Sequence, residues 1–288
     1  MTLVLPAYAK LNLTLDVIGR RADGYHDIES VMQTISLHDL VSVERSDCKV
    51  FDVVGPSIEG ENLVLKAARE LEAHVGQSLT FQIRLHKRIP VGAGLGGGSS
   101  DAAAFLRAAI ALYGIKISAP ELQEVAQRVG QDVPFFLRGG TALATGLGST
   151  VEPLPPIPAA WSFALVCPSI EVSTREVYAA VDGSAPSARR TAAVAAALKS
   201  GRAPDPGAFG NDLEATAVSK YPRLAEAVAP ARTRLPSLTM TGTGGAFFAA
   251  VPNAGEAAAP LEGPPPRPAP QGGGGPPIVL YRPVPAWG

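Results

Sequence analysis

A glycine-rich segment in the first half of the chain reads Pro90-Val91-Gly92-Ala93-Gly94-Leu95-Gly96-Gly97-Gly98-Ser99-Ser100-Asp101. Residues 81–89, which precede it, alternate apolar and polar side chains in the manner of a half-exposed strand. After it, Phe105, Ala109 and Leu112 share one helical face, and the pattern ends at Gly114. The order strand, glycine loop and helix is typical of a phosphate site, because glycines let the backbone approach an anion and the helix N-terminus offers free N–H groups.

Two common nucleotide sites do not fit this loop. No Gly-Lys-Ser or Gly-Lys-Thr occurs in the chain, which excludes a Walker-type loop. Residues 92–97 match the dinucleotide fingerprint G-x-G-x-x-G, but the strand before them carries Gln82, Arg84 and His86, whereas a Rossmann strand is buried on both faces. A nicotinamide site is therefore disfavoured. The remaining alternative is an ordinary tight turn before a helix capped by Ser99 or Ser100.

The composition limits the class of protein. The 288 residues contain 25 Lys and Arg against 26 Asp and Glu, a balance that argues against a nucleic-acid partner. The hydrophobic share of 46% is sufficient for a core, and no apolar run is long enough to predict a membrane span. The N-terminus lacks a secretory leader pattern, and Cys48 and Cys167 are too few for a disulfide framework. We expect a cytoplasmic protein that is a monomer or a weak homodimer.

The N-terminal segment predicts strands and a turn. Residues 11–17 alternate apolar and polar side chains, so that Lys10 and Asn12 share one face of a strand. The run 19–24 supplies a chain reversal, and two further strands are expected at 28–37 and 40–44, joined at His38-Asp39. Helices are expected over 62–75, with Gly76 as its C-terminal cap, and from a capping box at Ser118 to Glu121 up to Gly130.

A proline run at residues 153–158 marks the clearest internal boundary. We expect domains at 1–154 and 159–251. The second of these contains a strand at 161–166, helices at 174–181, 191–198 and 211–217, and a second glycine-rich turn at 241–245. Eleven of the 27 prolines lie in the tail 252–288, whose composition predicts loop or disorder, with residues 277–281 able to pair as one edge strand.

The glycine segment resembles the second motif of the GHMP kinases. Two further stretches resemble other motifs of that family: Ala9-Lys10-Leu11-Asn12-Leu13 with Gly19-Arg20-Arg21-Ala22-Asp23-Gly24-Tyr25-His26, and Gln131-Asp132-Val133-Pro134-Phe135-Phe136. Shorter stretches that resemble the family follow in the family's order as far as Tyr221-Pro222, and the resemblance covers roughly residues 6–250. It implies an α+β fold with an N-terminal kinase domain of the ribosomal-protein type and a ferredoxin-like C-terminal domain.

The resemblance also implies an activity and its residues. The nearest members transfer the γ-phosphoryl group of ATP, with Mg²⁺, to the 2-hydroxyl of a small-molecule substrate, the cytidine diphosphate conjugate of methylerythritol in the non-mevalonate isoprenoid route. Asp132 would be the catalytic base and Lys10 the second catalytic residue. The loop from Pro90 to Ser100 would bind ATP, with Ser99 and Ser100 as candidate Mg²⁺ ligands. The implied substrate-binding residues are Asn12, Tyr25, His26, Thr174 and Tyr178.

Each of these residues also has an ordinary interpretation. Asp132 can be a helix-terminus aspartate, Lys10 a solvated residue of an edge strand, and Tyr25 with His26 the packing of a hairpin loop. Two other functions stay open: a different GHMP kinase, such as a homoserine kinase, whose substrate carries no base, and a nucleotide-binding protein without phosphoryl transfer.

The chain departs from the family pattern at three positions. Gln131 stands where alanine is usual, Ser149 where glutamate is usual, and Gly245 where a hydroxyl residue ends the third motif. The backbone turn of the third motif is kept, but the loss of that hydroxyl predicts weaker contacts to phosphate or substrate there.

Overall fold

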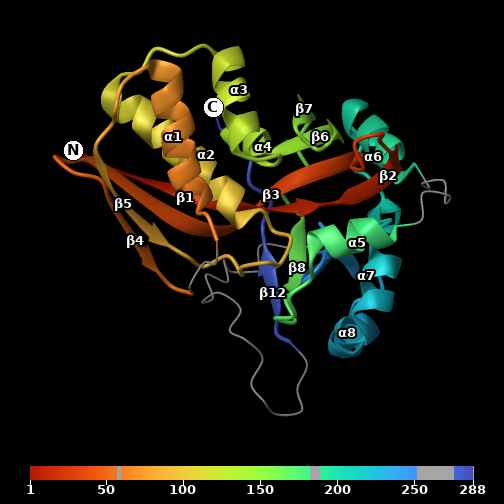
Figure 1. Cartoon of the computed structure of the whole chain (residues 1–288). Coiled ribbons are helices and arrows are strands. Elements are labelled where there is room, and N and C mark those ends of the chain that lie inside the picture. Colours follow the sequence, from red (N-terminus) through yellow and green to blue (C-terminus); the bar gives the residue numbers. More distant parts are fainter. Residues whose placement is uncertain (57–59, 182–188, 252–275, 288) are drawn as a thin grey trace.

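The strands of the chain form two sheets. The computed structural model describes residues 1–56, 60–181, 189–251 and 276–287 (Figure 1). Within these residues one sheet has eight strands and the other has four, and helices pack on both. This is an α+β architecture, as predicted. None of the described helices is long and apolar enough to cross a membrane.

The larger sheet is built around one long strand, β3 (His26–Arg45). It pairs antiparallel with β1 (Thr2–Asn12), β2 (Thr14–Arg20), β5 (Phe81–His86) and β6 (Thr141–Gly146). Three short strands extend the sheet: β4 (Val50–Val54) beside β5, β7 (Thr150–Pro153) beside β6, and β9 (Gly210–Asn211) beside β2. Among the described strands β1 pairs with β3 alone, up to its last residue, and the side chains of Lys10 and Asn12 near its end are buried.

The expected strand break at His38-Asp39 is wrong, because β3 runs through both residues. The pairing irregularity lies on the opposite strand, between Tyr8 and Ala9. The Asp39 carboxylate is fully buried and accepts a hydrogen bond from the backbone N–H of Ile89 at 2.8 Å. A polar pair that is typical of a turn therefore fits inside the sheet, because a neighbouring segment satisfies the carboxylate.

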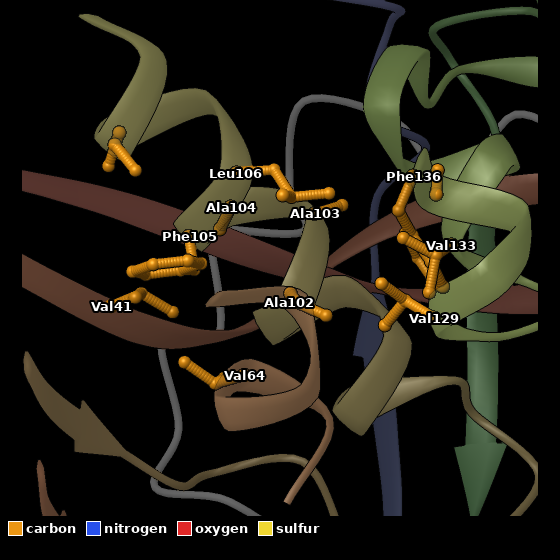
Figure 2. Packing of buried hydrophobic residues seen from close by; sticks show 14 of the residues in the cluster. Val41, Val64, Ala102, Ala103, Ala104, Phe105, Leu106, Val129, Val133 and Phe136 are labelled. Atoms are coloured by element: carbon orange, nitrogen blue, oxygen red, sulfur yellow. The ribbon is translucent and has the colours of Figure 1, made fainter. Parts of the chain in front are cut away.

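Four helices cover one face of the larger sheet: α1 (Leu63–Val75), α2 (Gly97–Tyr113), α3 (Ala119–Val129) and α4 (Val133–Arg138) (Figure 1). Figure 2 shows part of the core between them, where Phe105 of α2, Val64 of α1 and Val41 of β3 are fully buried in one apolar cluster. The predicted glycine cap at Gly76 and the capping box that begins at Ser118 are confirmed. The helices are thus held by buried apolar faces and by caps at their ends.

The smaller sheet has the order β10 (Thr239–Thr241), β11 (Ala246–Val251), β8 (Ser162–Val166) and β12 (Ile278–Tyr281). The helices in this part of the chain are α5 (Thr174–Ala180), α6 (Arg190–Lys199), α7 (Glu214–Lys220) and α8 (Pro222–Arg234), with a 3₁₀ turn at Pro206–Ala208. The helix expected from residue 211 begins only at Glu214, because Asn211 pairs with Leu15 in β9. α8 is not among the helices predicted from the sequence, although Pro222 suits its first turn.

The C-terminal segment joins the two sheets. β12 pairs antiparallel with β8 at the edge of the smaller sheet, and the chain then crosses β3, where the N–H of Val284 donates to the carbonyl of Thr34 at 2.8 Å. The N–H of Trp287 donates to the carbonyl of Arg138 at the end of α4, at 2.7 Å. The loop predicted for the tail falls largely at 252–275, outside the described residues.

The expected division into 1–154 and 159–251 stays a prediction. The proline run does separate β7 from β8. However, one apolar cluster contains Leu11 and Leu13 from the first segment together with Phe163 and Phe248 from the second. The two sheets therefore share part of their core.

Candidate active site

The glycine loop leads from β5 into α2, as the sequence predicts. Residues 90–98, together with Lys87, line a pocket of about 110 Å³. The helix begins at Gly97 with Gly96 as its N-cap, and no side chain caps it, so the alternative of a cap by Ser99 or Ser100 is wrong. Ser100 is buried within the helix. Because the first turn of a helix leaves its N–H groups without intrahelical partners, these groups are available to an anion at the loop.

Glycine is required at two positions of this loop. Gly96 has a φ of +72°, and a Cβ there would lie 2.7 Å from the Phe136 ring and 3.1 Å from the Lys10 side chain. Gly94 has a φ of +75°, and a Cβ there would lie 2.7 Å from the carbonyl oxygen of Thr241. The loop is therefore packed tightly against β1, α4 and the second glycine turn.

Lys10 and Asp132 lie together beside the loop. The Lys10 Nζ is 3.9 Å from the Asp132 Oδ2, and the backbone N–H of Lys10 donates to the carbonyl of Leu95 at 2.9 Å. Asp132 is the N-cap residue of α4, yet its carboxylate makes no capping hydrogen bond and stays one-third exposed. Burial lowers the pKa of Lys10, and the charge of Asp132 partly opposes this shift. A buried cation thus faces an accessible carboxylate.

Asn12 holds Lys10 in place. The Lys10 ammonium donates to the Asn12 side-chain oxygen, and the Asn12 amide donates to the Ser30 hydroxyl at 2.7 Å. The backbone N–H of Asn12 donates to the Thr241 hydroxyl at 2.8 Å. Ser30 and Thr241 are contributions that the sequence reasoning missed, and only the glycine-rich turn at 241–245 pointed to that region. In the structure, the Asn12 side chain supports Lys10.

An aromatic pair lies near the carboxylate. The rings of His26 and Tyr178 stack with centroids 5.4 Å apart and an interplanar angle of 28°. Burial raises the pKa of Tyr178 to about 12, and the negative charge of Asp132 adds to that shift. Burial, together with the charge of Arg20, lowers the pKa of His26. Tyr25, the residue before His26, is two-thirds exposed.

The His26 ring offers unused polar atoms. Neither of its nitrogens has a hydrogen-bond partner within the described part of the chain, although both are buried. Thr174, at the start of α5, shares a hydrogen bond of 2.7 Å with Thr243 of the second glycine turn. Since α5 carries both Thr174 and Tyr178, that turn helps to position the aromatic pair.

The residues present suit a nucleotide better than a resident metal ion. Among residues 1–56, 60–181, 189–251 and 276–287, no three His, Cys, Asp or Glu side chains cluster as a metal site. The loop instead offers backbone N–H groups, a helix N-terminus and the half-buried Ser99. Mg²⁺ that arrives on phosphate oxygens needs few protein ligands.

Comparisons with known proteins agree with this geometry. The family model for the N-terminal domain of GHMP kinases matches residues 62–140. The 4-diphosphocytidyl-2-C-methyl-D-erythritol kinase of Pelotomaculum thermopropionicum is 46% identical over 235 residues, which is 78% of this chain and 80% of that protein. The enzyme of the same name from Caldanaerobacter subterraneus is 40% identical over 250 residues, covering 85% and 86% of the two chains.

Solved structures extend the comparison. A crystal structure of 4-(cytidine 5'-diphospho)-2C-methyl-D-erythritol kinase superposes with a TM-score of 0.71 at 38% identity, covering 86% of this chain and 89% of that one. A homoserine kinase from Cytophaga hutchinsonii superposes with a TM-score of 0.61 at 17% identity, covering 88% and 86%. The second likeness supports the fold alone.

Proposed function

The chain belongs to the GHMP kinase family, among the 4-diphosphocytidyl-2-C-methyl-D-erythritol kinases, and from this premise we propose how its residues divide the work of phosphoryl transfer. The γ-phosphoryl group of ATP passes to the 2-hydroxyl of 4-diphosphocytidyl-2-C-methyl-D-erythritol. The observation that carries the proposed division is the Lys10–Asp132 pair, held 3.9 Å apart directly beside the glycine loop.

The glycine loop binds the phosphates of ATP. The N–H groups at the start of α2 and the positive end of its dipole favour an anion at this point. The loop contacts Lys10 at Gly96, so a terminal phosphate held there lies near the catalytic pair. When bound with ATP, Mg²⁺ neutralises charge on the phosphate oxygens. Ser99, which is half-buried in the first turn of α2, is the hydroxyl that we assign to this phosphate–Mg²⁺ group.

Asp132 acts as the base. Its accessible carboxylate accepts the proton of the substrate hydroxyl while that oxygen bonds to the γ-phosphorus and the bond from phosphorus to the bridging oxygen of ADP breaks. Lys10, which is buried and hydrogen-bonded to Asn12, keeps Asp132 oriented and stabilises negative charge on the transferred group.

The aromatic pair of His26 and Tyr178, together with Tyr25, recognises the cytosine base. The rings of Tyr178 and Tyr25 provide stacking surfaces, and a neutral His26 provides one donor and one acceptor for the polar edge of the base. The lowered pKa of His26 keeps its ring neutral near pH 7. Thr174, one helical turn before Tyr178 in α5, supplies a further hydroxyl. A homoserine substrate would leave these groups unused, which favours the cytidine compound.

A coupled ADP-release assay with this substrate tests the proposal. We expect Asp132→Ala to reduce kcat by roughly 10²–10⁴-fold, as loss of a general base does. Lys10→Ala should cost about 10²-fold, through loss of charge stabilisation. Asp205→Ala is the matched control, because Asp205 is likewise an N-cap residue but is exposed and far from the loop in sequence. Equal rates in all of these proteins would overturn the residue roles, and ATP turnover independent of the substrate would overturn the proposed acceptor.

A further inference from the structure

Three buried charged side chains lie beside the glycine loop and outside the catalytic pair. Asp39 is on β3, Lys87 follows β5, and Asp101 is in α2, and each is more than nine-tenths buried. The Lys87 Nζ is 2.8 Å from the Asp101 Oδ2 and also pairs with the Asp39 carboxylate. Charged side chains are seldom buried so completely unless they are paired, as these three are. We call these three residues the Lys87 cluster.

The Lys87 cluster connects the two ends of the glycine loop. The second carboxylate oxygen of Asp39 accepts hydrogen bonds from the backbone N–H groups of Arg88 and Ile89, the latter at 2.8 Å. These are the last residues before the loop begins at Pro90. Asp101 lies one turn into α2, where the loop ends. One ammonium group therefore ties the entrance of the loop to the helix that follows it.

Lys87 also touches the loop itself. It lines the same pocket as residues 90–98, and its Nζ lies 3.2 Å from the position that a Cβ on Gly97 would occupy. Gly97 is the first residue of α2. A displacement of Lys87 would therefore shift the helix N-terminus and the N–H groups that it presents. A cation at this end of a helix is unfavourable by itself, and the two carboxylates offset it.

Stability alone does not account for the cluster. Well-packed apolar side chains generally stabilise a core as well as a buried ion network does, whereas ion pairs impose direction and distance. One oxygen of Asp101 has no hydrogen-bond partner among the described residues. Asparagine has the same shape as aspartate, and its amide oxygen can accept a hydrogen bond from Lys87. A neutral amide should therefore be tolerated at this position.

We propose that Lys87, Asp39 and Asp101 are positioning residues for ATP, which fix the spacing between the loop entrance and α2 so that the loop N–H groups converge on the phosphates. This inference rests on the proposed binding of ATP at the glycine loop. The three residues act through the loop and do not touch the reacting atoms. Their loss should therefore affect the use of ATP more than the use of the second substrate.

Steady-state kinetics of the full chain test this role. We expect Asp101→Ala to raise the KM for ATP about 10-fold, because the loop loses one anchor. The KM for the methylerythritol substrate should change by less than about two-fold. Asp101→Asn should restore most of the affinity for ATP, because its amide oxygen can accept from Lys87. Should Asp101→Ala fail to fold, Asp101→Ser serves instead, since its hydroxyl is too short to reach Lys87.

The matched control is Glu72→Ala. Glu72 is also a carboxylate that pairs with a lysine, Lys49, and accepts from a backbone N–H, that of Leu79 at 2.7 Å, but it does so at the opposite end of β5. This control should lower the melting temperature without changing the KM for ATP. Asp101→Ala with a lowered melting temperature and unchanged KM for ATP would overturn the positioning role, as would equal rises in both KM values.

A second arm separates this inference from the proposed ATP site. Gly96→Ala disturbs the loop directly, since its Cβ would collide with Phe136. If Gly96→Ala raises the KM for ATP and Asp101→Ala does not, ATP binds at the loop and the role of the Lys87 cluster is wrong. An unchanged KM for ATP in Gly96→Ala would overturn the ATP site and the inference together.

Discussion

The chain contains two glycine-rich turns that meet in the structure but lead into different elements. Residues 90–98 lead from β5 into α2, a helix of 17 residues, whereas residues 242–245 connect β10 to β11 within one sheet. The turns touch backbone to backbone. A Cβ on Gly245 would lie 2.9 Å from the Cα of Ala93, and one on Gly94 would lie 2.7 Å from the carbonyl of Thr241.

This contrast shows that glycine content alone does not make a phosphate site. The first turn ends at a helix N-terminus, where N–H groups and the dipole attract an anion. The second turn connects strands that pair with each other, and it offers no such terminus. Its contribution is structural: Thr243 in the turn shares a hydrogen bond with Thr174, and Thr241, directly before the turn, accepts one from the backbone N–H of Asn12. In the proposed mechanism the first turn binds ATP, and the second supports the strand that carries Lys10 and the aromatic pair.

The largest effect is expected from Gly96→Ala in the first turn. The substitution places a Cβ against Phe136 and Lys10 at a φ of +72°, so both the loop and the catalytic lysine must move. A displacement of this size typically costs about 10²-fold in kcat/KM for ATP. Steady-state kinetics with ATP as the varied substrate measure it. Wild-type kinetics in Gly96→Ala would overturn the assignment of ATP to the first turn.

A smaller effect is expected from Gly245→Ala in the second turn. Its φ is +87°, and the new methyl group would press on Ala93 and on the carbonyl of Gly92. We expect the free energy of unfolding to fall by about 1–3 kcal/mol, as is typical for a strained backbone position. The KM for ATP should rise less than in Gly96→Ala. Chemical denaturation and kinetics on the same preparation give both values, and a larger ATP effect here than at Gly96 would reverse the comparison.

Thr243→Val should weaken the use of the methylerythritol substrate. It removes the hydroxyl that bonds Thr174 at 2.7 Å while keeping the side-chain shape. A hydrogen bond contributes about 1 kcal/mol net, which corresponds to a roughly five-fold change in an equilibrium constant. The KM for the methylerythritol substrate should therefore rise by about that factor. The KM for ATP should stay at the wild-type value. A rise confined to ATP would contradict the support that the second turn gives to α5.

The smallest effect concerns the pH dependence of folding at the aromatic pair. Burial lowers the pKa of His26, so the unfolded chain binds more protons than the folded chain between that lowered pKa and the ordinary value of 6.5. The contribution of His26 to the free energy of unfolding is therefore complete above pH 6.5. It is lost as the pH falls through the pKa that His26 has in the folded chain. Chemical denaturation between pH 5 and 7 should show a shallower dependence in His26→Gln than in wild type. Identical slopes would show that His26 is not held neutral.

The sequence predicted the glycine loop well because a strand, five glycines and a helix are adjacent in the chain. It also predicted Lys10 and Asn12 on one strand, since alternation depends only on neighbours. It did not predict the Lys87 cluster, which is assembled from β3, β5 and α2 by long-range strand pairing. Asp39 resembles a turn residue in the sequence for the same reason, because the N–H groups that satisfy it lie 49 and 50 residues away.

The most direct test of the proposed mechanism is Asp132→Asn, studied by binding and turnover together. The amide keeps the shape of Asp132 but cannot accept a proton in the reaction. We predict wild-type affinity for a non-hydrolysable ATP analogue and for the methylerythritol substrate, with ADP release slowed by at least about 10²-fold. ADP release at the wild-type rate would show that Asp132 is not the base and would contradict the mechanism.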